Sequence, residues 1–328
     1  CISRRQGSSA LNYSYSRLDT YKKCPRKYAY KYLEKPDIEK RASIEAYLGT
    51  TCHNAIQQIY RDIALSKRMS LQEVLAFYED EWDKKRPDNL RIVRERYSEE
   101  HYRETGRKYV QDFYAAHVPF EDGRTIGVEK DVYINIKDGY MLVGRIDRLV
   151  DHGKGCLEVI DYKTDRNLPS LQDLEQNWQL PLYHLGLQQM FPEVTDVKCT
   201  WYYLAHGKPL SLRRTQEDLD RLKGDVLALI GTIESVATFE PNPTALCSWC
   251  DYEAICPARK HLFAVASLPP EEFLKDDGVS LVDAYLAVKQ EMSDAEVKKE
   301  TLKERIYAYA QQHGVSVIRG SQQQIKVW

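Results

Sequence analysis

The 328-residue sequence is notable first for what it lacks. It has no apolar run near the roughly 20 residues that a membrane-spanning helix needs, so no membrane partner is predicted. It shows no secretory signal, which favours a cytoplasmic location. It has no Gly-x4-Gly-Lys-Ser/Thr motif, which excludes a P-loop motor within these residues. Internal repeats and low-complexity tracts are also absent, so a repeat architecture is not expected.

An excess of one charge is missing as well, because 47 Lys and Arg residues face 49 Asp and Glu residues and the formal net charge is −2. Nucleic-acid binders usually present a basic patch, but overall neutrality does not exclude a local one. Two basic clusters are present, and each is explained as simply by a solvated helix face. The first comprises Lys22, Lys23, Arg26, Lys27 and Lys31; the second comprises Arg91, Arg94, Arg96, Arg103, Arg107 and Lys108.

Hydrophobic patterning predicts a large helix-and-strand domain followed by a small module. Residues 1–12 form an expected flexible lead-in, rich in Ser, Arg and Gly. The main domain is predicted over residues 13–265, with a helical insertion at about 54–120. A Pro-containing linker around Leu268 then precedes a module of helices and a hairpin over residues 271–328.

Periodicity predicts the individual elements. Apolar spacing of three and four residues predicts helices over 44–65, 70–85, 94–117, 216–238, 279–291 and 294–313, the last capped by Ser293. Two short helices are expected to meet at Cys24-Pro25, and a capping box at Ser170 predicts one helix to about Met190. Runs rich in Val, Ile and Tyr predict an antiparallel meander of Ile126–Ile136, Tyr140–Val150 and Cys156–Tyr162, a strand Val197–Leu204 and a terminal hairpin of Val315–Arg319 and Gln323–Val327.

Two carboxylates and one amine stand out in the meander. Asp161 and Lys163 alternate at the end of one predicted strand, so both point to the same side of the sheet. If that strand pairs with the one before it, Asp147 lies beside Asp161. A divalent cation would relieve the repulsion between two such carboxylates and would lower the pKa of an attacking water. Asp-x-Lys is nevertheless a common pattern, and an unremarkable surface pair is the plainer interpretation.

Three further residues could complete such a site. His53, on a predicted helix upstream, is a plausible third ligand of a metal ion, although a lone His is more often structural. Gln179 and Tyr183 are four residues apart on one predicted helix, so they share a face and could reach a phosphate or Lys163. A half-buried helix face explains the same spacing, and Pro181 between them is expected to distort the helix.

Eight cysteines are distributed unevenly, and Cys247, Cys250 and Cys256 crowd together. A tetrahedral metal ion or a cubane cluster needs a fourth thiolate, for which Cys24 is the best candidate. Cys24 and Cys256 each precede a proline, so each is expected to cap a helix whose dipole favours a thiolate. The scattered Cys52, Cys156 and Cys199 are predicted to be core residues.

In their order and context, His53, Gly144-Arg-Ile-Asp147, Asp161-Tyr-Lys163-Thr and Gln179-x-x-x-Tyr183 resemble the motifs of RecB-like nucleases in the PD-(D/E)XK superfamily. The resemblance spans residues 14–260 and implies an α/β (α+β) fold, with a restriction-endonuclease-like core of a central mixed sheet flanked by helices, an N-terminal helical region and a small C-terminal module. It implies Mg²⁺ or Mn²⁺ on His53, Asp147, Asp161 and the Tyr162 carbonyl, with Lys163 catalytic. Gln179 and Tyr183 would support them, and Glu129 could add an outer contact.

The cysteine spacing resembles that of iron–sulfur nucleases in the same branch, including AddB-type recombination nucleases and CRISPR-associated relatives. The resemblance implies a [4Fe–4S] cluster on Cys24, Cys247, Cys250 and Cys256, with zinc as the physical alternative. We therefore expect a DNA exonuclease that acts on single strands or DNA ends in repair, recombination or defence, and that could work with a helicase or recombination partner. The alternatives are a catalytically silent DNA-binding or scaffold module and a zinc-stabilised interaction protein. Unpaired bases could stack on Tyr13, Tyr15, Tyr21 and Tyr28, for which core packing is the plainer interpretation.

Overall fold

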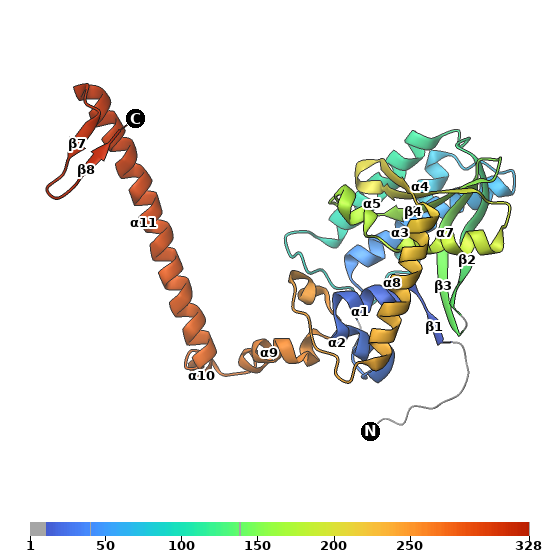
Figure 1. Cartoon of the computed structure of the whole chain (residues 1–328), viewed down its shortest axis with the longest axis horizontal. Helices are drawn as coiled ribbons and strands as arrows, with labels where there is room; N and C mark the ends of the chain where they lie inside the picture. Colours follow the sequence, from blue (N-terminus) through green and yellow to red (C-terminus); the bar gives the residue numbers. More distant parts are fainter. Residues whose placement is uncertain (1–10, 40, 138, 328) are drawn as a thin grey trace. The chain divides into compact units, whose positions relative to one another are not determined.

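The computed structural model describes residues 11–39, 41–137 and 139–327. The chain divides into two compact units, Cys1–Ala258 and Arg259–Trp328, which are described separately (Figure 1). No helix within the described ranges is long and apolar enough to cross a membrane. Most of the expected lead-in lies outside the described residues, but its last part does not, because residues 11 and 12 already belong to a strand.

A six-stranded mixed sheet forms the centre of the first unit, which confirms the predicted class of fold. Its main path runs β1-β3-β4-β5-β6, and β2 also pairs with β3. The β2-β3-β4 part is the predicted antiparallel meander, whereas β4 and β5 are parallel and need a helical crossover. The strands are β1 (Leu11–Tyr13), β2 (Arg124–Lys137), β3 (Tyr140–Asp151), β4 (Cys156–Lys163), β5 (Asp196–Tyr203) and β6 (Lys208–Arg213).

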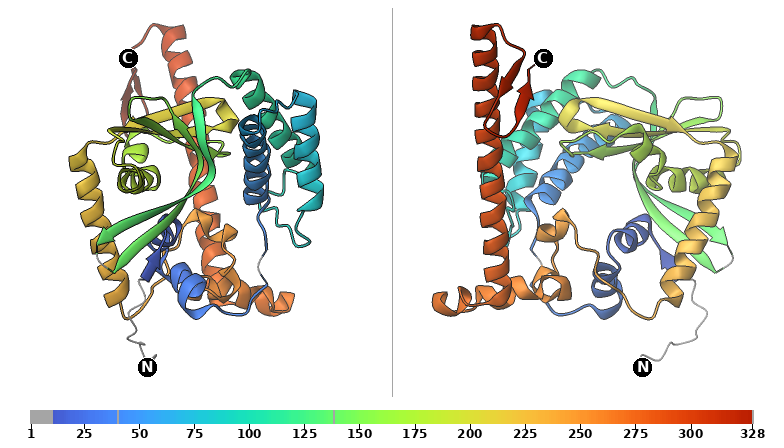
Figure 2. Two further views of the ribbon diagram at one scale, coloured as in Figure 1. Left: turned by 90° about the vertical axis from the view of Figure 1, so that its right-hand side faces the viewer. Right: turned by 60° about the vertical axis from the view of Figure 1, so that its left-hand side comes forward.

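Helices cover both faces of this sheet. Figure 2 shows α3, α4 and α5 on one side of it and α7 and α8 on the other. The helices of the unit are α1 (Tyr15–Lys23), α2 (Pro25–Tyr28), α3 (Ile44–Ala64), α4 (Leu71–Lys84), α5 (Glu99–His117), α6 (Leu171–Glu175), α7 (Gln179–Met190) and α8 (Gln216–Ser235). A π-helix, Ala29–Glu34, continues α2.

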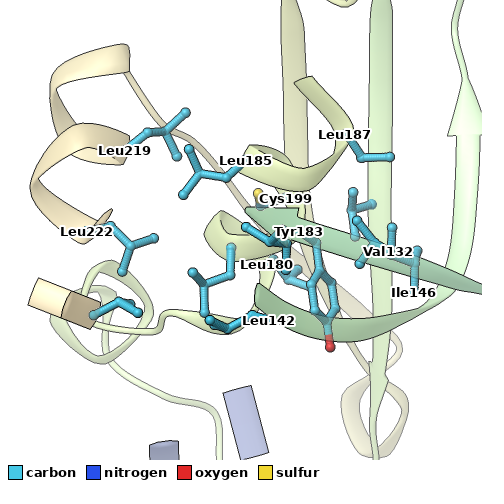
Figure 3. Close-up of a cluster of buried hydrophobic side chains, with 14 of the residues drawn as sticks. Val132, Leu142, Ile146, Leu180, Tyr183, Leu185, Leu187, Cys199, Leu219 and Leu222 are labelled. Carbon is cyan, nitrogen blue, oxygen red and sulfur yellow. The ribbon is translucent and has the colours of Figure 1, made fainter. Parts of the chain in front are cut away.

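Two hydrophobic clusters lie on opposite sides of the sheet because successive strand residues alternate between faces. Leu149 and Val159 belong to the cluster under α7 and α8 (Figure 3), whereas Val150 and Ile160 belong to the cluster under α3, α4 and α5. Strand β4 is therefore buried on both faces from Leu157 to Tyr162. Both clusters fix β4, whose last residues carry Asp161 and Lys163.

The helix expected from Ser170 to Met190 is two helices instead. The predicted capping box at Ser170 is formed with Asp173, but α6 ends after one turn. The side chain of Asn177 then accepts a hydrogen bond from the Gln179 backbone N–H (2.9 Å), which starts α7. Pro181 consequently lies in the first turn of α7, where its missing N–H breaks no helical hydrogen bond. The prediction that Pro181 distorts the helix is therefore wrong.

Three other elements differ from the sequence-based prediction. The third helix of the insertion begins at Glu99, capped by Ser98, rather than at residue 94. The short strands β1 and β6 were not predicted. Strand β6 is an edge strand, which tolerates Pro209 because no further ladder needs its N–H.

The second unit contains α9 (Lys260–Ala266), α10 (Pro270–Phe273), α11 (Asp277–His313) and the antiparallel hairpin of β7 (Val317–Arg319) and β8 (Gln324–Lys326) (Figure 1). The hairpin agrees with the prediction. The two expected helices are one 37-residue helix, because no Gly or Pro interrupts the chain near Ser293. Gly314, at φ +62°, ends α11 in the left-handed conformation that glycine adopts easily.

Candidate functional site

The candidate site forms where β3 and β4 separate. Their pairing ends at Arg148 and Ile160. One residue further, the Asp147 carboxylate (Oδ2) accepts a hydrogen bond from the backbone N–H of Tyr162 at 2.9 Å, in place of a ladder hydrogen bond. Strand β4 continues on β5 alone as far as Lys163. The result is an open strand end at which Asp147 lies opposite Asp161.

Asp161, Lys163 and Gln179 form a closed polar ring at this strand end. The Lys163 ammonium lies 2.6 Å from Asp161 Oδ2 and donates to Gln179 Oε1 at 3.1 Å. The Gln179 amide donates in turn to Asp161 Oδ1 at 2.6 Å. The first residue of α7 thus holds both a carboxylate and an amine of β4. The structure brings together these three residues as the sequence pattern suggested.

His53 reaches the same point from α3. Its Nδ1 lies 3.3 Å from Asp147 Oδ2, and its Nε2 lies 2.6 Å from the carbonyl oxygen of Tyr162. One turn earlier, a Cβ added at Gly49 would lie 3.3 Å from Thr164 Oγ1, so glycine allows the helix to lie close to the end of β4. The four groups expected to bind a metal ion therefore lie close together: His53 on α3, Asp147 on β3, and Asp161 and the Tyr162 carbonyl on β4.

Burial and like charge dominate the electrostatics of this place. Burial raises the pKa of Asp147 to about 6, with further repulsion from Asp161 and partial relief from His53. Burial acts against the charge of Lys163, but the attraction of Asp161 outweighs it and the pKa of Lys163 is raised. Two opposed carboxylates with a nearby imidazole and carbonyl oxygen suit a divalent cation chemically. Across the described ranges, however, no three His, Cys, Asp or Glu side chains are arranged to hold an ion as they stand.

Tyr183, one turn along α7, lies mainly in the hydrophobic core. Figure 3 shows its ring among Val132, Ile146 and Leu180, with the hydroxyl oxygen at the edge of the group. A Cβ added at Gly144 would lie 2.2 Å from Tyr183 Cε1, so the ring packs directly on the β3 backbone. Burial raises the pKa of Tyr183. Its placement supports α7, and through α7 the position of Gln179.

The Glu129 side chain is engaged by Gln57 and Arg145. Glu129 occupies β2 between residues paired with Arg148 and Ile146, which is opposite Asp147, at a strained φ of +52°. Its side chain accepts a hydrogen bond from Gln57 on α3 and lies 3.6 Å from Arg145. The contact expected from Glu129 is therefore made with the flanking helix.

Among the tyrosines near the N-terminus, Tyr15 is the one that approaches the site. Burial raises its pKa to about 12, and the charges of Lys163 and Asp161 also act on it. Sequence reasoning grouped it only with possible base-stacking residues. The available signal was Ser14, whose side chain caps α1 and so fixes the helix start at Tyr15. Tyr13, Tyr21 and Tyr28 are buried, in line with core packing.

Cys24 lies beside the loop that follows α8. It caps α2 as expected, and its sulfur accepts hydrogen bonds from the backbone N–H groups of Lys27 (3.5 Å) and Asn242 (3.4 Å). The Asn242 amide also donates to the carbonyl of Lys23 at 3.0 Å. These contacts bring Cys24 to the segment that leads into the other three cysteines.

Cys247 lies in the 3-10 turn Ala245–Trp249, which Cys250 follows directly, and Cys256 lies between the turns Glu253–Ile255 and Pro257–Arg259. The helix expected after Cys256 begins as the 3-10 turn Pro257–Arg259, which α9 continues from Lys260. Burial raises the pKa of Cys250, to which the charges of Asp251 and Cys24 add while Lys27 opposes them. All three thiols, and that of Cys24, are free of disulfide bonds. Cys52 and Cys199 are buried as predicted, whereas Cys156 is half-exposed and donates to Asp196 (3.3 Å).

An open cleft of about 720 Å³ adjoins the polar ring, beginning at Thr164, which follows Lys163. The guanidinium of Arg166 lies 4.8 Å from the ring centroid of Tyr97 and contacts His101 Nε2 at 3.3 Å. The cleft also contains carboxylates, so its charge is mixed. Its lining includes Glu45, Arg94, Tyr102, Tyr109, Asp165 and Arg166.

Comparison with known protein families assigns the chain to a class of nucleases. The model of the PD-(D/E)XK nuclease superfamily matches residues 12–257, which is most of the chain. The chain belongs to the PD-(D/E)XK nuclease superfamily. The match covers all of the sheet except Leu11 and includes every residue of the candidate site. No match was found among curated proteins.

Two solved structures that match the chain are distant from it in sequence. A protein from Eubacterium rectale named "Putative exonuclease" covers 77% of this chain and 88% of its own, at 9% identity and a TM-score of 0.42. A protein named SSO0001 covers 74% of this chain and 95% of its own, at 15% identity and a TM-score of 0.29.

Proposed function

We propose that the protein is a Mg²⁺- or Mn²⁺-dependent deoxyribonuclease of the RecB-like branch, which removes nucleotides from single-stranded DNA or DNA ends. The observation that carries this proposal is the polar ring of Asp161, Lys163 and Gln179 beside Asp147 and His53. An unremarkable surface pair would be exposed, whereas Asp161 is only 5% exposed. A buried carboxylate braced by a half-buried amine at an open strand end fits a catalytic role better than a structural one.

The donor set suits a hard divalent cation. Two carboxylates, one imidazole and one backbone carbonyl offer oxygen and nitrogen ligands, and the mutual repulsion of the carboxylates gives a cation a reason to bind. We propose His53, Asp147, Asp161 and the carbonyl of Tyr162 as its ligands. When bound, such an ion would neutralise charge on a phosphodiester and lower the pKa of a water molecule.

The side chains of the chain have separate tasks in this proposal. Lys163, which Asp161 keeps protonated, places a positive charge where negative charge develops on phosphate oxygens. Gln179 holds the amine and the carboxylate at fixed positions, so that neither must be ordered when substrate arrives. Tyr183 keeps α7, and therefore Gln179, against β3.

The adjoining cleft supports single-stranded DNA as substrate. Arg94 and Arg166 offer charges to phosphates, and the half-buried Tyr109 offers a ring to unpaired bases. Glu45 and Asp165 in the same lining disfavour tight, indiscriminate binding of polyanions. We place the activity in DNA repair, recombination or defence, with a helicase as a plausible partner that would supply single strands.

A cleavage assay tests the proposal on end-labelled single and double strands, with Mg²⁺, with Mn²⁺ and with chelator. We expect metal-dependent release of nucleotides that is reduced at least about a hundredfold by Asp161→Asn or Lys163→Met. Lys208→Met, which changes an exposed lysine on the edge strand β6, is the matched control. Unchanged cleavage by both active-site variants would reject the proposed roles and favour a catalytically silent DNA-binding or scaffold module.

We also propose a [4Fe–4S] cluster on Cys24, Cys247, Cys250 and Cys256. Support comes from four free thiols, from the hydrogen bonds that hold Cys24 at the loop of the other three, and from the electrostatic contact of Cys24 with Cys250. Zinc on the same thiols is the alternative. Anaerobically purified protein should be brown and contain iron and sulfide, which Cys250→Ser removes and Cys156→Ser does not. Colourless protein with stoichiometric zinc would favour the alternative.

A further inference from the structure

Helix α11 carries an exposed apolar stripe that the nuclease proposal does not use. The side chains of Leu281, Tyr285 and Met292 are 72%, 67% and 69% exposed, and they lie on one stripe rather than scattered singly over the surface. The chain's own hairpin covers only the end of the helix, where Ala310 is buried. Stripe positions follow each other at alternating four- and three-residue steps: Leu281, Tyr285, Val288, Met292, Ala295, Lys299 and Leu302.

This spacing is the heptad repeat of a coiled coil, in which the a and d positions face another helix. Tyr285, Met292 and Lys299 occupy a positions, whereas Leu281, Val288, Ala295 and Leu302 occupy d positions. The described residues of its own unit leave this face of the long helix open, and pairing with another helix would bury it. The charges beside the stripe decide between possible partners, because residues at e and g lie next to the seam.

We propose that α11 pairs with α11 of a second copy of the chain in antiparallel orientation. In the register that sets Met292 opposite Ala295 of the second helix, Tyr285 meets Leu302 and Val288 meets Lys299. The flanking g positions then pair Glu291 with Lys298.

The flanking e positions in the same register pair Lys289 with Glu296. Twofold symmetry repeats both the e and the g pair, so opposite charges meet at each of these places. Lys299 already lies 2.6 Å from Glu296 on its own helix. Its apolar stem can therefore cover the seam while its charge stays compensated at the edge.

Other self-pairings place like charges together. A parallel, in-register pair would oppose Glu291 to Glu296 and Lys298 to Lys303, and would face Lys299 with itself. Shifting the antiparallel register by one heptad in either direction sets Glu296 or Glu291 against its own copy. The sequence of α11 thus favours one orientation and one register.

Sedimentation velocity of the full chain across concentrations tests the proposal. Wild type should be a dimer at micromolar concentration. Glu291→Lys and Lys298→Glu, made singly, should each weaken the dimer by at least about tenfold, and the double reversal should restore it. Glu304→Lys, an equal charge change at the outward-facing f position, should leave the dimer unchanged. Helical content measured by circular dichroism verifies that each variant folds.

Three results would overturn the inference. A wild-type monomer at every concentration means that another surface covers α11. A dimer that neither single reversal weakens means that the association lies elsewhere. A dimer strengthened by Glu291→Lys alone means that the helices run parallel. None of these substitutions changes a residue of the candidate active site, so each outcome is independent of the nuclease proposal.

Discussion

Replacing Gly144 by Ala should show that Tyr183 acts through packing. The added Cβ would lie 2.2 Å and 2.8 Å from two ring carbons of Tyr183, well inside the ~3.5 Å at which carbon atoms attract each other. Gly144 pairs with Val132 in the sheet, and the ring is held within the hydrophobic core, so neither side can yield freely. Overpacking of this kind typically costs about 1–3 kcal/mol.

A double-mutant cycle isolates the contact. Tyr183→Leu removes the ring and itself destabilises by a few kcal/mol, as truncations in cores do. In that background Gly144→Ala should cost little, giving a coupling free energy of about 1–3 kcal/mol. Urea denaturation measures all four proteins. Gly224→Ala on α8 is the control, because its added Cβ meets nothing within 4 Å.

The same variants separate packing from chemistry. Tyr183→Phe keeps the ring, so DNA cleavage should stay within a few-fold of wild type if the hydroxyl has no catalytic role. Gly144→Ala should lower cleavage by displacing α7 and with it Gln179. Equal destabilisation by Gly144→Ala with and without the Tyr183 ring would refute the packing argument. Loss of cleavage in a stable Tyr183→Phe protein would restore a chemical role.

The parts of the site that sequence could predict follow from backbone geometry. Asp161 and Lys163 share a face because strand side chains alternate, whatever the surrounding fold. The register of a hairpin sets Asp147 opposite Asp161. The end of the β3–β4 ladder was not predictable, since it depends on the Asp147 carboxylate replacing a backbone acceptor for Tyr162.

Elements that depend on single side chains or distant contacts escaped prediction. The break before α7 depends on Asn177, whose side chain competes with the backbone for the N–H of Gln179. Strand β1 has only three residues, and its parallel pairing with β3 is a long-range contact without a local signal. The closeness of α3 to β4 depends on Gly49, which no periodicity reveals.

Three further predictions concern the ring, the metal ion and a buried base. Gln179→Leu should lower the rate of cleavage by about ten- to a hundredfold with little loss of stability, because Lys163 and Asp161 both lose their hydrogen bonds to the Gln179 amide. An unchanged rate would show that Gln179 does not contribute to catalysis. Mn²⁺ should bind the folded state and increase the free energy of unfolding by up to ~2.7 kcal/mol at a hundredfold excess over its dissociation constant, which raises the melting temperature. Asp147→Asn should abolish this rise in a scanning-fluorimetry assay. An equal rise in the variant would place the ion elsewhere. His184 provides the pH test, because burial lowers its pKa from 6.5 to about 4. Between those values the unfolded chain binds the proton and the folded chain does not, so stability falls as pH falls. From pH 7 to pH 5 this one group should cost about 2 kcal/mol. His184→Gln cannot take up that proton, so its free energy of unfolding should fall by correspondingly less over the same interval, and parallel pH profiles of the two proteins would show that the buried imidazole is not the cause.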